Sequence, residues 1–425
     1  MWYQKIVQIF KIKELRDKIL FILFIFAIFR LMANIPIPGV DVLAIKRFFA
    51  NFQVFSLLNL FTGGALERLS IVMLGLGPYI TAIVILQLLT MVFPSLEKMY
   101  KEGGPEERQK FEQYGRILTC PLAALQALGM ITLFSRQGIL TQMSPLAKLS
   151  AVSCVTAGTV LLMWLGELIS EKKIGNGVSL LIFAGIVADF PNNFYQLIRS
   201  YEPTMLFNYL IFFFAALLII AGVVFVNEGR RNIPVSYAKR VRGMRLYGGV
   251  STYLPLNVNP AGVMPIIFAL SILTFPSMVS NFLSNSPGLL GKIAREIVLT
   301  FEQPVFHAVF YFLLVVLFTF FYTLVTFDPK AISENLQKMG GFIPGIRPGK
   351  STAQYLSYIL NRVLIFGAIF LGLIAIMPNI VQALTGIKAF RFLVGGTSIL
   401  IIVSVILETL RQIKAELEMR EYETF

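Results

Sequence analysis

The residues that could do chemistry in this chain are few, and they form no catalytic pattern. His307 is the single histidine, and there is no H-E-x-x-H, G-x-S-x-G or G-x-x-x-x-G-K-S/T motif. Cys120 and Cys154 lie in apolar stretches at a spacing that suits neither a disulfide framework nor a metal site, so we expect two small buried hydrophobic residues. The sequence therefore predicts a protein that is not an enzyme and that has no metal or cofactor.

Charged side chains inside membrane spans would instead indicate transport, because ion-coupled transporters generally hold carboxylates there. Glu167, Asp189, Asp328 and Glu408 all fall near the ends of apolar stretches, where water or headgroups can solvate them. Arg30 lies within a stretch but close to one end, where its long side chain can snorkel to water or pair. This distribution disfavours ion-coupled transport and leaves open an inverted-repeat secondary transporter for a small neutral solute.

The elements that position these residues are membrane spans. With 56% hydrophobic and 14% charged residues and a mean hydropathy of +0.74, the chain is more apolar than a soluble core can bury. The first apolar run lacks a small-x-small cleavage site, so we expect a retained span and not a signal peptide. A span needs about 20 mostly apolar residues. Ten are predicted: 19–36, 72–93, 115–134, 146–166, 177–190, 206–226, 261–282, 304–326, 357–377 and 392–409.

The distribution of positive charge predicts the orientation of these spans. If the N-terminus is cytoplasmic and each span reverses direction, most Lys and Arg residues lie on the inner side, which places both termini in the cytoplasm. The spans then divide as five plus five, with an N-terminal half 1–190, an external hinge loop 191–204 and a C-terminal half 205–425. Because the first half would begin on the inner side of the membrane and the second half on the outer side, this is the topology of an inverted repeat.

The stretch 56–94 departs from a simple span. It begins as an apolar run too short to cross a bilayer, passes Gly63 and Gly64, and becomes a full-length apolar segment only after Gly75 and Gly77. Short or irregular backbone at membrane depth is tolerated only where protein buries it or where it lines a water-filled cavity. We therefore expect the chain to enclose a cavity that this stretch enters.

Two long inner segments, 227–260 and 328–356, are candidates for a docking surface. The first is strongly basic, and the second carries proline and glycine at a density that stiffens and bends a loop. Alternatively, the basic charge of the first segment serves only to orient the chain in the membrane. Orientation alone would need far fewer charges than this segment holds.

Eight short motifs run in order from the first predicted span to the last: Ile35-Pro-Ile-Pro-Gly39, Phe61-Thr-Gly-Gly-Ala65, Gly77-Pro-Tyr-Ile80, Trp164-Leu-Gly-Glu167, Gly175-Asn-Gly177, Tyr237-Ala-Lys-Arg240, Phe342-Ile-Pro-Gly-Ile-Arg-Pro-Gly349 and Gly395-Gly-Thr-Ser398. In sequence and spacing they resemble the SecY family, the protein-conducting channels of the bacterial Sec translocon. The resemblance covers essentially the whole chain. It implies an all-α polytopic protein of the bacterial cytoplasmic (inner) membrane, with ten spans in two clamshell halves around an hourglass pore.

The resemblance also implies where the pore closes. A short plug helix at about 57–70 would close its outer side, with the plug residues Leu60, Phe61, Gly63, Gly64, Leu66 and Arg68. A ring of apolar side chains would form the constriction. The implied ring residues are Leu76, Ile80, Val178, Ile182, Ile267 and Ile401. Ile80 follows Leu76 by four residues, and Ile182 follows Val178 by four, so each pair would project from one helix face.

Two further features follow from the resemblance. A lateral gate between spans two and three and spans seven and eight would release apolar segments into lipid. Polar residues at matching positions are Thr81, Gln87 and Asn259. Pro260, which departs from the family pattern, would alter the entry geometry of span seven. The inner segments would dock the motor ATPase SecA and the ribosome, including its RNA, and the small subunits SecE and SecG would accompany the channel. The substrates would be unfolded preproteins with their signal peptides. The implied docking residues are Arg240, Arg242, Arg347 and Lys350.

Overall fold

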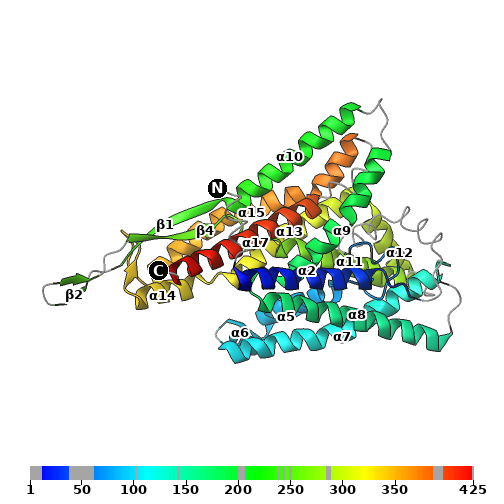
Figure 1. Ribbon diagram of the computed structural model, residues 1–425, viewed down its shortest axis with the longest axis horizontal. Coiled ribbons are helices and arrows are strands. Elements are labelled where there is room, and N and C mark those ends of the chain that lie inside the picture. The colour runs from blue at the N-terminus through cyan, green and yellow to red at the C-terminus, as the bar shows by residue number, and fades with distance from the viewer. Residues whose placement is uncertain are drawn as a thin grey trace.

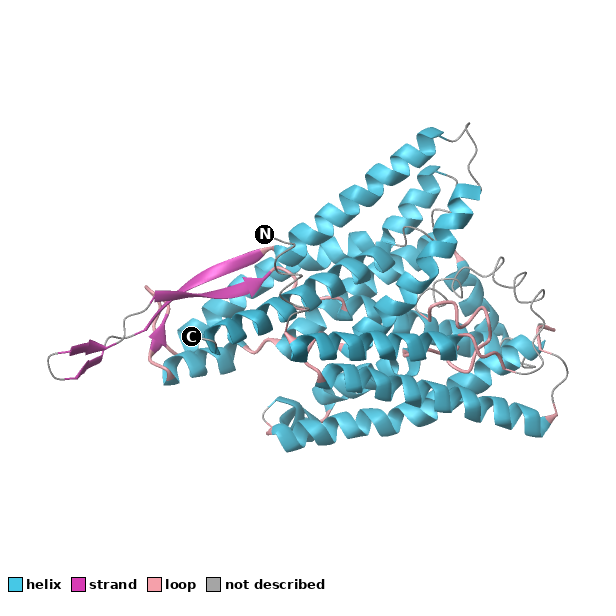
Figure 2. Ribbon diagram, viewed as in Figure 1, coloured by secondary structure: helices cyan, strands magenta, loops and turns pink. Residues whose placement is uncertain are grey.

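The computed structural model of the chain is a bundle of long helices from which strands project at one end (Figures 1 and 2). It describes residues 12–37, 62–101, 103–136, 138–140, 144–199, 206–237, 240–242, 245–247, 251–283, 289–385 and 396–423.

Every stretch predicted as a span contains a helix. Proline at the first position of a helix lacks only a donor that has no partner there, and α8 begins in this way after Ser144, whose Oγ accepts a hydrogen bond from the Ala147 amide (3.3 Å). The helices are α2 (Lys13–Ala33), α5 (Gly77–Val92), α7 (Pro105–Arg136), α8 (Pro145–Glu171), α9 (Gly177–Arg199), α10 (Leu206–Glu228), α11 (Met264–Leu283), α13 (Pro304–Thr326), α15 (Lys350–Thr385) and α17 (Gly396–Glu423).

Fewer helices are long and apolar enough to cross a membrane by length and composition alone. Within the described ranges there are five such segments, and a sixth if α5 and its continuation are counted as one bent span. The apolar parts of α9 and α11 that the structure describes are shorter, Gly177–Pro191 and Met264–Leu273. The five segments are Pro105–Ser135, Pro145–Glu171, Tyr209–Glu228, Val305–Lys338 and Lys350–Met377.

Among the described residues there are also three shorter helices: α6 (Pro94–Lys101), α12 (Leu289–Glu302) and α14 (Pro329–Lys338). The chain bends by 116° between α5 and α6, at the point where Pro94 removes a backbone donor. α14 begins at Asp328, whose Oδ1 accepts hydrogen bonds from the amides of Lys330 (2.8 Å) and Ala331 (3.3 Å). Asp328 is therefore a helix N-cap.

The main apolar core lies between helices of both halves of the chain. α2, α5, α8 and α9 contribute to it from the N-terminal half, and α10, α11, α13, α15 and α17 from the C-terminal half. α7 and α8 form one outer face of the bundle, and α10 lies at the opposite side (Figure 1).

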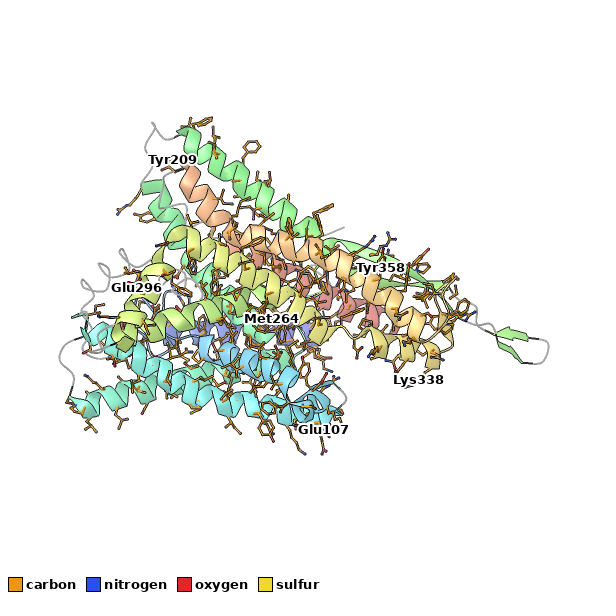
Figure 3. All side chains as sticks on the ribbon, turned by 180° about the vertical axis from the view of Figure 1, so that it is seen from behind. Glu107, Tyr209, Met264, Glu296, Lys338 and Tyr358 are labelled. Carbon is orange, nitrogen blue, oxygen red and sulfur yellow. The ribbon has the colours of Figure 1, made fainter. Side chains whose placement is uncertain are left out.

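The two ends of the bundle differ in what they carry. From behind, Lys338 of α14 and Tyr358 of α15 lie toward the end with the strands, and Tyr209 of α10 and Glu296 of α12 lie toward the other end (Figure 3). The start of α2 and the last part of α17 are joined by a contact between the Lys18 ammonium and the Glu416 carboxylate.

The segments 227–260 and 328–356 meet in one sheet, which we call the docking sheet after the role expected for these segments. β1 (Arg230–Tyr237) pairs antiparallel with β4 (Ser251–Asn257) on one side and with β5 (Gly341–Phe342) on the other. β2 (Arg240–Arg242) and β3 (Arg245–Tyr247) form a separate hairpin beyond the sheet (Figure 1). The sheet and the adjacent helices α14 and α15 enclose their own small core of buried side chains: Ile233, Val235, Leu256, Leu336, Ile343 and Leu356.

We expect Leu356→Ala to destabilise the docking sheet, because Leu356 is 0% exposed at the centre of this core. A buried Leu→Ala substitution typically costs about 2–5 kcal/mol. The measurement is the rate at which trypsin cleaves within 230–257 in membrane vesicles. Leu373→Ala on the same helix is the matched control, since Leu373 is 48% exposed. Equal cleavage rates for the two variants would contradict the role of this core.

The prediction that both cysteines are buried is wrong. Cys120 on α7 and Cys154 on α8 are exposed on the surface of the bundle. A thiol behaves as a small hydrophobic group, so a lipid-facing position accommodates it as readily as a core position does.

Candidate functional site: plug seat, apolar ring and docking sheet

Residues 62–76, which we call the turn segment, hold the described part of the predicted plug. They form consecutive turns and not a helix, so the predicted plug helix is not seen between residues 62 and 70. Gly63 (φ 64°) and Gly64 (φ 77°) adopt the left-handed conformation that glycine tolerates, and Leu69 (φ 43°) adopts it as well, which interrupts a helix. Two predicted plug residues, Leu60 and Phe61, lie outside the described residues.

The turn segment packs against α8 and α9 through backbone atoms. A Cβ atom on Gly63 would lie 2.8 Å from the Gly185 Cα of α9, and a Cβ atom on Gly158 of α8 would lie 2.2 Å from the Ile71 carbonyl oxygen. Both distances are shorter than real Cβ contacts. Glycine at 63 and at 158 is therefore required for the segment to lie this deep.

Main-chain hydrogen bonds also join the turn segment to the residues after α2. The Ile37 amide donates to the Leu69 carbonyl (2.9 Å), and the Ile71 amide donates to the Ile35 carbonyl (3.0 Å). Pro36 and Ser70 form an isolated antiparallel bridge between these two bonds. Main-chain pairing therefore holds residues 69–71 of the turn segment against residues 35–37.

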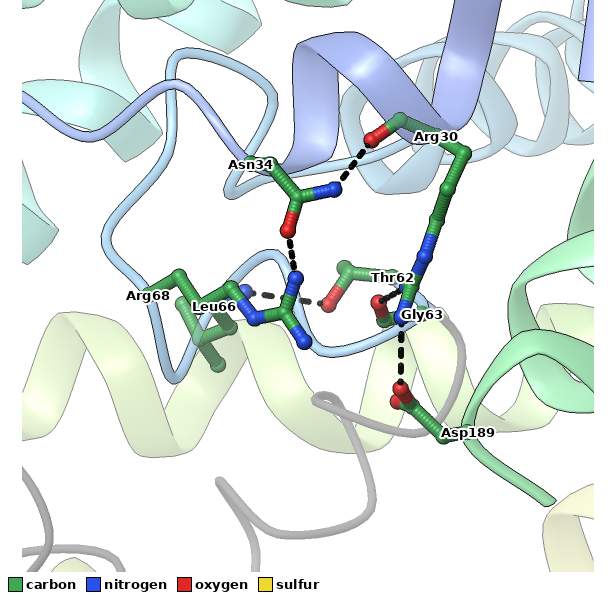
Figure 4. A network of polar contacts seen from close by, with 7 residues as sticks. All are labelled: Arg30, Asn34, Thr62, Gly63, Leu66, Arg68 and Asp189. Carbon is green, nitrogen blue, oxygen red and sulfur yellow. Dashed lines mark hydrogen bonds and ion pairs between the residues drawn. The ribbon is translucent and has the colours of Figure 1, made fainter. Parts of the chain in front are cut away.

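A polar network surrounds the start of the turn segment (Figure 4). The Arg30 Nη1 donates to the Gly63 carbonyl (2.7 Å), and its Nη2 lies 3.6 Å from the Asp189 Oδ1. The Arg68 guanidinium donates to the Asn34 side-chain oxygen, and the Asn34 Nδ2 donates to the Arg30 carbonyl (2.7 Å). Of the two roles expected for Arg30, snorkelling and pairing, the structure has pairing.

The apolar side chains of the turn segment divide between two cores. Ala65 and Val72 join the main core. Leu66, Leu69 and Met73 are 1% exposed and join a second core with residues of α7 and α8. The segment therefore separates these two cores, and Leu66, one of the predicted plug residues, faces the second.

The residues predicted to form the ring come together in the main core. Leu76 precedes α5 as its N-cap residue, Ile80 lies on α5 and Ile182 on α9, and all three are buried. Ile267 on α11 and Ile401 on α17 are buried in the same cluster, and Val178 is half-buried against it. The cluster contains many other side chains, so membership alone does not distinguish the six.

The helices of the predicted gate are in contact, since α11 packs against both α5 and α7. On α5, Thr81 and Gln87 are buried, and the Thr81 hydroxyl donates to the Gly77 carbonyl (2.9 Å). Asn259, just before α11, donates to the Asn227 side-chain oxygen of α10 (2.9 Å) and to the Gly262 carbonyl (3.0 Å). The bonds that Asn259 donates therefore tie the start of α11 to α10.

The predicted docking residues lie on the docking sheet and its loops. Arg347 and Lys350 are exposed, and the Arg347 carbonyl accepts a hydrogen bond from the Thr352 hydroxyl (2.9 Å). This bond fixes the main chain beside Arg347 and leaves its side chain at the surface. Arg240 and Arg242 belong to β2, in the hairpin beyond the sheet.

Sequence reasoning missed the partners of the charged groups. Asp189 and Glu167 were expected near water or headgroups, but Asp189 is 9% exposed and lies beside Arg30, and Glu167 pairs with Arg116 of α7 (2.7 Å). Arg411 of α17, which was not singled out, pairs with Glu228 at the neck of the docking sheet (2.7 Å). No sequence signal links these pairs, because their members are far apart in the chain. Within the described ranges, no cluster of His, Cys, Asp and Glu side chains could hold a metal ion.

Comparison with known proteins agrees with this arrangement. A family model described as SecY matches residues 70–410. The protein translocase subunit SecY of Streptomyces galbus is 44% identical over 434 residues, which cover 98% of each chain.

Two solved structures share the fold. One is a SecY whose plug domain stabilizes the closed state of the translocation channel and maintains a membrane seal; its TM-score is 0.63 at 21% identity, over 92% of this chain and 90% of that one. The other is Sec61 in the canine ribosome-channel complex from the endoplasmic reticulum, with a TM-score of 0.63 at 18% identity over 93% and 91% of the two chains. The family model matches most of this chain, and the chain is 44% identical to the Streptomyces protein. The chain therefore belongs to the SecY family.

Proposed function

We propose that the chain is the central pore-forming subunit of a protein translocation channel, which passes unfolded preproteins across the membrane and releases hydrophobic segments sideways into lipid. The observation that carries this proposal is the turn segment, an irregular stretch packed deep among helices that ends at Leu76, four residues before Ile80. In a membrane, such backbone is stable only where protein buries it or a cavity receives it. A segment in this place can block a pore in the resting state and leave it when a substrate enters.

The six apolar residues Leu76, Ile80, Val178, Ile182, Ile267 and Ile401 are, in this proposal, the seal of the pore. A narrow apolar constriction disfavours hydrated ions, because removing their water costs free energy. Such side chains offer no specific hydrogen bonds and can close around any passing sequence. Their joint burial in the main core supports this role.

The proposed lateral gate is closed in this arrangement, because α11 lies against α5 and α7. Thr81 and Gln87 would line it on the α5 side. Asn259 would act from the other side as the fixed end of α11, since its hydrogen bonds run to Asn227 and Gly262. Opening then requires α11 to separate from α5 and α7 while its start stays joined to α10.

We place the ten helices across the bacterial cytoplasmic membrane, with both termini and the docking sheet on the cytoplasmic side. The contact between Lys18 and Glu416 supports a shared side for the two ends of the chain. The basic residues of the docking sheet support the cytoplasmic assignment of that side. The two halves, 1–190 and 205–425, would be the inverted repeats.

The docking sheet is the proposed contact for the motor ATPase SecA and for the ribosome, whose RNA would meet the basic residues. The relative solved in a ribosome-channel complex supports a ribosome as partner. Arg347 is exposed on a loop whose backbone is fixed, and Lys350 is exposed at the start of α15, so little freedom is lost when Arg347 binds a carboxylate or phosphate. SecE and SecG are the expected membrane subunits, and no other nucleic-acid role is proposed.

Reconstitution tests the function. The channel, purified from its native membrane with the small subunits that accompany it, is placed in vesicles with the motor ATPase, ATP and a presecretory protein. We expect the presecretory protein to become protected from external protease. If the vesicles protect no presecretory protein but take up a small solute along a gradient, the result would instead support the secondary transporter.

A further inference from the structure

We infer that Arg30, Asp189 and Asn34 form a polar clasp that holds the turn segment in its seat, and that Arg30 is the positioning residue on which the closed pore depends. This inference rests on the proposed function, in which the turn segment is the described part of the plug.

The clasp joins three elements through one guanidinium. Arg30 lies in the last turn of α2, and its two terminal nitrogens serve different partners: Nη1 binds the Gly63 carbonyl at 2.7 Å, and Nη2 lies 3.6 Å from the Asp189 Oδ1 of α9. The planar fork of an arginine suits two such partners at once. Arg30 therefore connects α2 and α9 to the backbone of the segment between them.

The turn segment also covers the carboxylate that Arg30 neutralises. Asp189 is 9% exposed, and a Cβ atom on Gly64 would lie 3.1 Å from each of its carboxylate oxygens. A carboxylate buried to this degree is tolerated only beside a cation or strong donors. Without Arg30, the seated segment would enclose an unpaired negative charge.

A second attachment lies at the surface. Arg68 of the turn segment donates to the Asn34 side chain, which donates in turn to the Arg30 carbonyl (2.7 Å). Exposed polar contacts of this kind contribute little free energy. Asn34 therefore orients the segment, and the partly buried contacts of Arg30 hold it.

Resting ion conductance tests the clasp, measured in planar bilayers with KCl on the complex purified with its small subunits. We expect Arg30→Gln to raise the conductance by about tenfold, the scale of one lost charge-assisted hydrogen bond. Adding Asp189→Asn should lower the conductance below that of Arg30→Gln, because the double variant encloses no unpaired carboxylate, while the bond from Arg30 to the Gly63 carbonyl stays lost. Arg16→Gln, on the same helix at a site where the side chain is 44% exposed, is the matched control.

A chain that lacks residues 57–70 separates the two claims. If the clasp acts through the plug, Arg30→Gln adds no conductance in this background. If the deletion leaks but Arg30→Gln conducts like the parent, the clasp is overturned and the channel function still stands. The same conclusion follows if the double variant leaks more than Arg30→Gln. A deletion that does not leak contradicts the plug itself.

Lysine at position 30 provides a second variant in case Arg30→Gln does not assemble. An ammonium cannot serve both partners with the fork of a guanidinium. The conductance of Arg30→Lys must therefore exceed that of the parent, and an unchanged value overturns the clasp.

Discussion

Replacing Ile80 and Ile182 by glycine is expected to raise the ion conductance of the resting channel by at least about tenfold, because an apolar constriction excludes ions only while its side chains fill it. The two residues are buried in one cluster, Ile80 on α5 and Ile182 on α9. Each substitution removes a whole side chain from one wall of the proposed seal. The measurement is single-channel conductance in planar bilayers without motor or substrate.

Glycine also weakens a helix, by about 1 kcal/mol relative to alanine, so the control must carry the same penalty. Ile83→Gly with Val187→Gly places two glycines on the same two helices. Ile83 lies toward Gly115 of α7, and Val187 is 41% exposed. A control pair that leaks as much as the ring pair would mean that the helices, and not the ring, keep the channel closed.

Charge reversal at Arg347 is expected to abolish motor-driven translocation while leaving assembly of the channel intact. Arg347 is exposed, and its loop is fixed by the bond from the Thr352 hydroxyl to the Arg347 carbonyl and by the bond from the Ser333 hydroxyl to the Gly349 carbonyl (2.7 Å). Arg347→Glu turns a donor for carboxylates into a repelling charge on a loop that cannot move away. The measurement is ATP-dependent protease protection of a presecretory protein in vesicles.

Lys330→Glu is the matched charge reversal. Lys330 is exposed in the first turn of α14, where an acidic residue favours the helix dipole, so the variant should fold at least as well as the parent. Equal loss of translocation in both variants would show that the motor responds to the overall charge of the docking sheet and not to Arg347.

The sequence was sufficient to locate the helices in the ten predicted spans, because each span needs a long apolar run that few other structures allow. It did not determine how α5 begins. The apolar stretch continues from 71 without interruption, but the helix starts at Gly77, since residues 62–76 are held in turns by contacts with α8 and with the residues after α2. Tertiary contacts override local preference there.

The docking sheet could not be predicted, because β5 pairs with β1 across about a hundred residues and has only two residues of its own. Proline and glycine around 340–349 indicate a bent loop but do not reveal the strand to which it is joined. The candidate site was limited in the same way. Arg30 and Asp189 are each visible as unusual charges, and only the packing of α2 against α9 brings them together.

The connections of the docking sheet determine how a force on it would be transmitted. β1 continues from α10, β4 leads into α11, and β5 lies between α14 and α15, so every strand of the sheet is attached to helices of the C-terminal half. A partner that pulls on the sheet therefore acts first on the C-terminal half. The load reaches α11, whose contacts with α5 and α7 would have to separate for the proposed lateral gate to open. We expect the N-terminal half to stay in place while the C-terminal half moves relative to it.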